Sequence, residues 1–380
     1  MVQKIYGVIM SRILFHLNCL EQGGAERVVS TLANAFAKTG DEVLVATEWI
    51  GENEFELDDN VTRILVGPTP EEEKNSRISK AITRITRLKK ALVECKVDVA
   101  ISFGKSANYR LLMSGKFLEI PIIMSVRSNP VGNYESKIDK IMGPLLYPRA
   151  DGAVFQTVGQ REFFPLYLQN KSTIILNPVN EKYVGVPRTD KPDNAVVYSG
   201  RIVDFKNQSM LLRAFIRVHK AYPDMELRLY GGDSGDGTWE ILEKIISDNN
   251  AAEYIKLLGA SGNLEQELSK GRLFAFSSDE EGLPNSVIEA MALGLPVVST
   301  DCPCGGPRTI IENEINGLLV PVGDEKAMAA AMVRLIENPD FAEKLGKKAR
   351  EIVNITESNY IIDQWKNYIE QVIKRRYSRE

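Results

Sequence analysis

The chain has 380 residues, of which 44% are apolar and 26% charged, with a net charge of −4. This length is too great for one compact core and suits two domains, and the composition is typical of a soluble globular protein. The charge argues against nucleic acid as the main partner. Two histidines exclude a histidine-rich metal site, and four cysteines without zinc-like spacing indicate reduced thiols in a cytoplasmic protein.

The amino-terminal apolar run does not have the pattern of a signal peptide. Ser11 and Arg12 interrupt it, and no small-residue cleavage pattern follows. Residues 12–17 are expected to form the first strand instead. No stretch approaches the roughly 20 apolar residues that a membrane span needs, so we expect a soluble chain that at most sits on a membrane surface.

A glycine-bearing loop follows this strand and leads into a predicted helix. Gly23 and Gly24 precede apolar residues at helical spacing, and Gly40 closes the pattern. Paired glycines let a backbone approach a ligand closely at a helix start, although a plain tight turn has the same sequence. The GxGxxG fingerprint is absent, so a nicotinamide cofactor is not indicated.

Strands and helices alternate through the rest of the first half, which predicts a parallel, doubly wound sheet. The further strands are expected near residues 43–47, 61–66, 98–102, 122–126 and 152–156. Polar side chains that would face a ligand follow two of these strands: Lys105 in one loop, Arg127 and Asn129 in the other. Alternatively, Arg127 is only a surface loop cation and Asn129 only a turn residue, an interpretation that fits the sequence nearly as well.

The segment from Arg77 to Lys96 has the pattern of a basic amphipathic helix. Arginines and lysines crowd around its apolar stripe, and only Glu94 is acidic. The stripe consists of Ile78, Ala81, Ile82, Ile85, Leu88 and Leu92. Such a helix suits a membrane interface or the binding of pyrophosphate groups, whereas a solvated charged face over a core stripe is the alternative.

A polar, proline-bearing segment after residues 173–180 predicts the domain boundary. We expect one doubly wound domain at residues 1–178, a second at 179–356, and a helix at 357–380 that crosses back onto the first. Strands of the second domain are predicted at residues 195–199, 226–230, 255–258, 272–276, 296–300 and 317–320. Helices are predicted near residues 209–222, 238–249, 265–270 and 326–337. A further helix of about ten residues is expected between the strands that end at 276 and begin at 296, because Pro284 can start a helix and Gly294 can end one.

Charged side chains follow two of these strands. Arg201 and Lys206 lie five residues apart after the first strand. Glu281 lies in the loop after residues 272–276, and Glu289 is embedded among apolar residues of the next helix. Ligands bind at this end of an open α/β sheet, and a buried carboxylate needs a hydrogen-bonding partner. Sugar hydroxyls would supply one, as would a neighbouring backbone; a surface pair of charges is the alternative for Arg201 and Lys206.

Together, these residues resemble the paired-glutamate motif of the retaining glycosyltransferase family 4, also called glycosyl transferases group 1. Gly282 and Pro284 lie between Glu281 and Glu289, and residues 301–308, 311–313 and 316–320 also resemble that family. Leu283, Pro284 and Asn285 stand where many members carry an aromatic, a glycine and an apolar residue. This departure places the chain with a bacterial surface-polysaccharide assembly branch.

The resemblance implies a GT-B fold of two Rossmann-like domains facing across a cleft. It also implies sugar transfer from a nucleotide diphosphate donor, expected to be UDP-linked, to a growing glycan on a lipid carrier such as a polyprenyl pyrophosphate. Glu289 would bind the ribose hydroxyls and Glu281 the sugar hydroxyls. Arg201 and Lys206, after Gly200, would stabilise the leaving diphosphate, and the amides that would assist are those near Gly23, Gly24, Leu283, Pro284 and Asn285.

No cofactor and no catalytic metal are expected beyond this donor. Metal-dependent transferases use an Asp-x-Asp motif, and the nearest candidate, Asp233 and Asp236, has the wrong spacing. A nucleotide-sugar 2-epimerase of the same fold is the first alternative, and a non-catalytic sugar-nucleotide-binding or glycan-binding protein is the second. An enzyme of this kind would work in the cytoplasm or on the inner face of the cell membrane.

Overall fold

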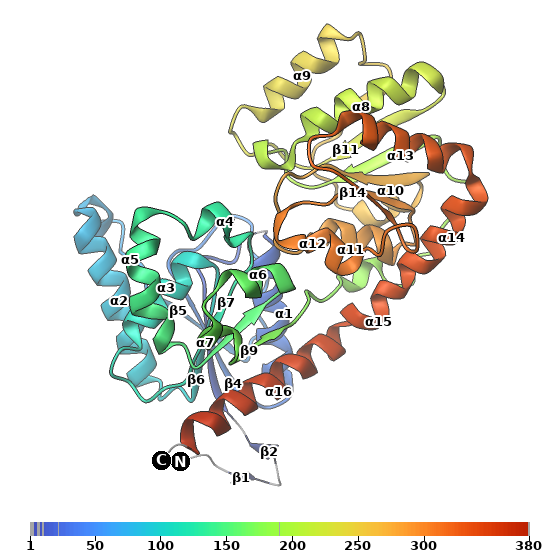
Figure 1. The fold of residues 1–380 in the computed structure, drawn as a ribbon. Helices are drawn as coiled ribbons and strands as arrows, with labels where there is room; N and C mark the ends of the chain where they lie inside the picture. The colour runs from blue at the N-terminus through green and yellow to red at the C-terminus, as the bar shows by residue number, and fades with distance from the viewer. Residues whose placement is uncertain (1–3, 6–7, 10, 22, 190, 379–380) are drawn as a thin grey trace. The chain divides into compact units, whose positions relative to one another are not determined.

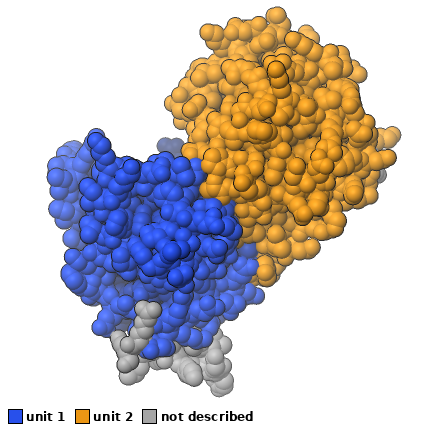
Figure 2. All heavy atoms as spheres, in the orientation of Figure 1, with its two compact units in different colours: residues 1–175, 361–380 blue, residues 176–360 orange. Residues whose placement is uncertain are grey.

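The structure is a computed structural model that describes residues 4–5, 8–9, 11–21, 23–189 and 191–378 (Figure 1). The chain forms two compact units, which Figure 2 colours separately: residues 1–175 with 361–380, and residues 176–360. The domain boundaries predicted from the sequence fall after residues 178 and 356. Each unit contains one parallel sheet.

The first unit is built on a seven-stranded parallel sheet in the order β5-β4-β3-β6-β7-β8-β9. Its strands are β3 (Arg12–His16), β4 (Glu42–Thr47), β5 (Val61–Leu65), β6 (Val99–Phe103), β7 (Ile122–Ser125), β8 (Gly152–Phe155) and β9 (Ser172–Ile174). A separate antiparallel pair, β1 (Lys4–Ile5) and β2 (Val8–Ile9), precedes them.

Helices alternate with these strands. They are α1 (Gly24–Lys38), α2 (Arg77–Glu94), α3 (Lys105–Ser114), α4 (Pro130–Asn133), α5 (Lys137–Leu146), α6 (Val158–Phe163) and α7 (Leu166–Gln169). The last helix, α16 (Ser358–Tyr377), packs on the same unit, with the Trp365 ring stacked 5.5 Å from that of Phe103. None of the described helices is both long and apolar enough to cross a bilayer.

The second unit has a six-stranded parallel sheet in the order β12-β11-β10-β13-β14-β15. Its strands are β10 (Ala195–Ser199), β11 (Glu226–Tyr230), β12 (Ile255–Leu257), β13 (Leu273–Phe276), β14 (Val297–Thr300) and β15 (Leu318–Val320). Its helices are α8 (Gln208–Ala221), α9 (Thr238–Asp248), α10 (Leu264–Ser269), α11 (Asn285–Ala292), α12 (Gly306–Ile310), α13 (Glu325–Glu337), α14 (Pro339–Ala349) and α15 (Val353–Thr356).

Both sheets are doubly wound, as the sequence predicts. Every residue of β10, β13 and β14 is buried, because helices cover both faces of a parallel sheet. In each sheet the strand order reverses once, between β3 and β6 and between β10 and β13. Ligands of such folds bind beside this reversal, at the carboxyl ends of the strands. The loops that leave β10 and β13 are therefore the natural position for a site.

Candidate active site

Two loops of the second unit, residues 200–207 and 277–284, leave neighbouring strands at the strand-order reversal. We call them the switch-point loops. The first starts in a tight corner, because a Cβ atom on Gly231 would lie 1.9 Å from the Gly200 carbonyl oxygen. Gly231 must therefore be glycine for the β11 loop to approach the β10 loop this closely.

Lys206 and Glu281 meet across the switch-point loops. The Lys206 ammonium forms an ion pair with Glu281 Oε1, and both side chains are 13% exposed. Ser278 Oγ donates a second hydrogen bond to the same oxygen at 3.0 Å, and the ammonium lies 5.1 Å from the centre of the Phe276 ring. The structure thus brings together a cation and an acid that the sequence places 75 residues apart.

Arg201 stands at the start of the same loop and is exposed. Its backbone oxygen accepts a hydrogen bond at 2.8 Å from Nε2 of the buried Gln208, which fixes the corner after β10. Within the described part of the chain, Arg201 has no carboxylate partner, whereas Lys206 is paired with Glu281. A guanidinium provides a planar fork of donors for phosphate oxygens, and an ammonium provides a point charge.

Hydrogen bonds that the sequence did not predict hold the switch-point loops in register. Asn207 Nδ2 donates to Asp279 Oδ1 at 2.8 Å, and the Asp279 amide donates to the Phe205 oxygen at 2.8 Å. Ser277 Oγ donates to the Lys206 oxygen, also at 2.8 Å. Asn207 has a left-handed backbone (φ 46°) and caps α8 through the Met210 amide. An asparagine directly before a predicted helix start is the signal that could have identified this cap.

A third loop supports Glu281 from the β14 side. Cys304, another non-glycine residue with positive φ (56°), donates from its thiol to the Glu281 oxygen at 2.9 Å. A Cβ atom on Gly306 would lie 2.1 Å from the Gly282 oxygen. Burial raises the pKa of the Cys302 thiol, which keeps this neighbour neutral. No sequence signal marked Cys304 for this position.

The short helix α11 starts directly after the second switch-point loop. Pro284 precedes it and Leu283 is buried beside it, and the Pro284 oxygen accepts hydrogen bonds at 3.2 Å from the amides of Val287 and Ile288. Asn285 accepts a hydrogen bond at 2.7 Å from Asn177 Nδ2. Glu289 is only 7% exposed, in agreement with the burial expected from its apolar neighbours.

Gly23 and Gly24 occupy the corresponding position in the first unit, where the β3 loop leads into α1. Gly24 is the first residue of α1, and Gly23 has an extended backbone that precedes it. A Cβ atom on Gly23 would lie 2.2 Å from Glu26 Oε2, so a side chain there would displace Glu26. Their role toward a ligand stays a prediction.

The other three predicted residues of the first unit have structural partners. Lys105 forms an ion pair with the buried Asp139 at 2.6 Å. The Arg127 guanidinium packs 4.7 Å from the Phe103 ring, and desolvation lowers its pKa to about 9. Asn129 accepts from the Val131 amide at 3.2 Å and caps α4. These contacts favour a structural role for each, and a role in substrate binding stays a prediction.

The basic helix α2 is less cationic in the fold than in the sequence. Arg84 pairs with Glu48 at 2.7 Å, Arg87 with Glu72 at 2.9 Å and Lys80 with Glu73 at 2.9 Å. Leu88 and Leu92 are buried, whereas Ile78 and Ile82 are 74% and 56% exposed. The predicted apolar stripe is therefore buried at one end of the helix and exposed at the other.

The carboxylates of the β11 loop bind backbone amides. Asp236 accepts from the amides of Asp204 and Thr238, and these bonds lower its pKa. Asp233 accepts from the Gly235 amide at 2.9 Å. Over the described residues, no three His, Cys, Asp or Glu side chains are grouped so that they could hold a metal ion. Metal independence stays a prediction.

Two family models match the chain, one in each half. The model described as Glycosyltransferase Family 4 matches residues 22–182. The model described as Glycosyl transferases group 1 matches residues 193–338. The second match contains both switch-point loops and α11.

Similar proteins are named as glycosyltransferases. One is the GalNAc-α-(1→4)-GalNAc-α-(1→3)-diNAcBac-PP-undecaprenol α-1,4-N-acetyl-D-galactosaminyltransferase of Campylobacter jejuni, 26% identical over 96% of this chain and 99% of its own. Another is an uncharacterized glycosyltransferase of Methanocaldococcus jannaschii, 28% identical over 77% of this chain and 84% of its own.

Solved structures share the architecture. Sucrose-phosphate synthase from Thermosynechococcus elongatus superposes with a TM-score of 0.81 at 18% identity, covering 96% of this chain and 100% of that one. The Anabaena HepE protein in complex with UDP superposes with a TM-score of 0.78 at 16% identity, covering 95% and 100%. At these identities the likeness shows the fold alone, which is the GT-B fold.

Proposed function

Because the chain belongs to the glycosyltransferases of family 4 and group 1, we propose that it transfers a hexose or N-acetylhexosamine from a UDP-sugar to a growing glycan. The observation that best supports this donor site is the meeting of Lys206 with Glu281 at the strand-order reversal of the second unit. One side chain suits a diphosphate and the other suits sugar hydroxyls.

In the proposed complex, the diphosphate takes the place of Glu281 as the partner of Lys206. Arg201 binds the same phosphates, and the amino end of α11 assists, because a helix start favours anions. Glu281, released from the ion pair, accepts hydrogen bonds from the transferred sugar. Glu289 accepts them from the ribose.

The reaction in this proposal retains the anomeric configuration. The bond between the anomeric carbon and the diphosphate oxygen breaks, and the acceptor oxygen forms its bond on the same face. The acceptor proton passes to the leaving phosphate, so no side-chain nucleophile is needed. Lys206 and Arg201 stabilise the charge that grows on the diphosphate, which is the role that a metal ion would otherwise have.

The acceptor is proposed to be a glycan on a polyprenyl diphosphate carrier. The printed names of two Campylobacter jejuni relatives contain an undecaprenol-linked or diphospho-undecaprenol-linked glycan. The exposed Ile78 and Ile82 at the start of α2 would then rest on the cytoplasmic face of the membrane.

A panel of UDP-, GDP- and ADP-sugars tests the proposal, first by thermal shift and then by product analysis with an undecaprenyl-diphosphate glycan in vesicles. We expect one UDP-sugar to stabilise the protein and to be transferred with retention, equally fast in EDTA. A modified sugar nucleotide formed without acceptor would identify the 2-epimerase instead. Donor binding with neither sugar transfer nor slow donor hydrolysis would indicate a non-catalytic protein.

The membrane contact is tested in the same assay. The double variant Ile78→Asp with Ile82→Asp should slow transfer on vesicles, whereas Ile241→Asp, at a 50% exposed position of α9, should not.

A further inference from the structure

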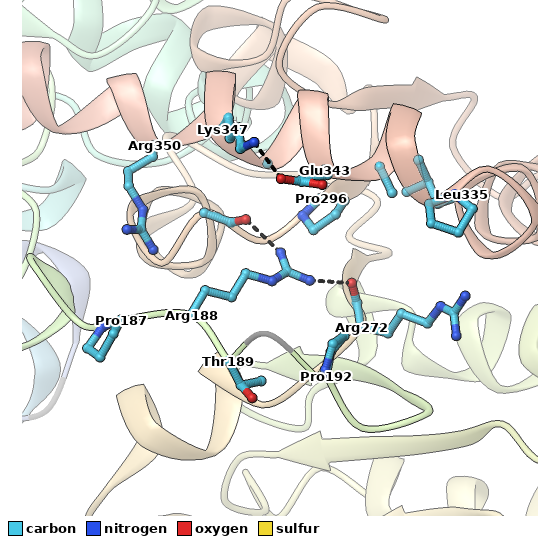
Figure 3. Close-up of a pocket in the computed structure, with 14 residues that line it drawn as sticks. Pro187, Arg188, Thr189, Pro192, Arg272, Pro296, Leu335, Glu343, Lys347 and Arg350 are labelled. Carbon is cyan, nitrogen blue, oxygen red and sulfur yellow. Dashed lines mark hydrogen bonds and ion pairs between the residues drawn. The ribbon is translucent and has the colours of Figure 1, made fainter.

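The second unit contains a pocket of about 810 Å³ that is separate from the switch-point loops. Arg272 precedes β13, and Gly294 and Pro296 precede β14, so the pocket opens at the amino ends of these strands. The candidate active site is at their carboxyl ends. The remaining walls come from Pro187, Arg188, Thr189 and Pro192 and from the α13–α14 region (Figure 3).

The charge of this pocket is strongly positive. Its cationic lining residues are Arg188, Arg272, Lys347 and Arg350. Among the described residues that line it, Glu343 alone is acidic, and its carboxylate pairs with Lys347 (Figure 3). Among the described lining residues, three arginines therefore share the pocket with one carboxylate, which is already paired with Lys347.

Arg188 and Arg350 are held in place by backbone oxygens. Arg188 donates to the Gly294 oxygen at 2.6 Å and to the Arg272 oxygen at 2.9 Å (Figure 3). Arg350 donates from Nη2 to the Leu293 oxygen at 2.6 Å. Its Nε and Nη1 groups have no protein acceptor within the described ranges. Burial and the nearby charge of Arg350 lower the pKa of Arg188 to about 10. Two guanidinium groups are thus fixed close together and partly desolvated.

We propose that this pocket binds a phosphate-bearing small molecule, distinct from the sugar donor. A phosphoryl group accepts several hydrogen bonds from guanidinium donors and relieves the repulsion between Arg188 and Arg350. The volume is that of a small-molecule site rather than of a bare ion. Pro187, Pro192 and Leu335 give the remainder of such a ligand an apolar wall.

Arg188 and Arg350 connect this pocket to the proposed donor site through α11. The oxygens of Leu293 and Gly294, bound by Arg350 and Arg188, follow directly after the last turn of α11. The first turn of the same helix follows the switch-point loop that contains Glu281. A ligand in the pocket would therefore bind beside one end of the helix whose other end faces the donor.

Isothermal titration calorimetry of the full chain tests the proposal. The probes are inorganic phosphate and glucose 1-phosphate, each titrated at constant ionic strength. The Lys206→Ala protein is used so that the donor site contributes little. We expect saturable binding with a Kd below about 10 mM. Lys347→Glu should weaken it about five- to tenfold, and Glu343→Gln should tighten it about threefold, because each changes the local charge in the opposite direction.

The matched control is Lys344→Glu, an exposed position on α14 that does not line the pocket. It changes the net charge as Lys347→Glu does and should leave the affinity unchanged. Tighter binding of glucose 1-phosphate than of phosphate would support the proposal, whereas equal binding would indicate a site for the free anion and contradict it. Absence of saturable binding, or equal weakening by Lys344→Glu and Lys347→Glu, would overturn the proposal.

Discussion

Replacement of Lys206 by alanine is expected to lower kcat about 10²- to 10³-fold and to weaken UDP binding. The ammonium is the less exposed of the two cations in its loop, and a charge in a partly desolvated site stabilises a developing phosphate charge strongly. Steady-state transfer assays and UDP titration measure the two effects. Lys206→Arg should recover part of the rate, because it keeps the charge with a different geometry.

Two controls separate this catalytic effect from lost folding. Lys244→Ala removes an exposed lysine of α9 and should leave the rate unchanged. Lys206→Ala also leaves the Glu281 carboxylate without its cation, so the melting temperature should fall, and Lys206→Ala with Glu281→Gln should restore part of it. Near-normal transfer by a folded Lys206→Ala protein would remove Lys206 from the mechanism.

Replacement of Glu281 by glutamine is expected to lower kcat about 10²-fold without weakening the binding of UDP. The loss follows from the missing carboxylate acceptor for the sugar hydroxyls, since hydrogen bonds to charged groups are the stronger ones. UDP itself has no transferred sugar. Because Lys206 is freed from its ion pair, UDP should bind as tightly as to the wild type or more tightly.

The opposite effects on UDP affinity make this second prediction specific. Lys206→Ala weakens the binding of UDP, whereas Glu281→Gln does not. Ser278→Ala, which removes the 3.0 Å bond to Glu281 Oε1, is the milder companion and should reduce kcat by about tenfold or less. If Glu281→Gln weakens UDP binding as much as Lys206→Ala does, then Glu281 stabilises the loop structure and does not bind the transferred sugar.

Most strands could be predicted because parallel sheets bury both faces. The strands predicted at residues 195–199 and 226–230 match β10 and β11 at both ends. The predicted start and end signals of α11 are also confirmed: the helix begins after Pro284, and Gly294 has the left-handed backbone (φ 74°) that ends it. The predicted helix of about ten residues is eight residues long.

Contacts between distant segments could not be predicted, and they decide how free each charged residue is. Lys206 is paired with Glu281, and Lys105 with Asp139, because the fold brings together segments that no local pattern connects. The cations of α2 looked free in the sequence, yet Glu48, Glu72 and Glu73 from other segments pair with several of them.

The most direct test of the central claim is a crystal structure of the protein with UDP bound. Our account predicts the diphosphate beside Arg201 and Lys206, the ribose beside Glu289, and Glu281 separated from Lys206. Electron density for UDP far from these four side chains, with the Lys206–Glu281 ion pair intact, would contradict it.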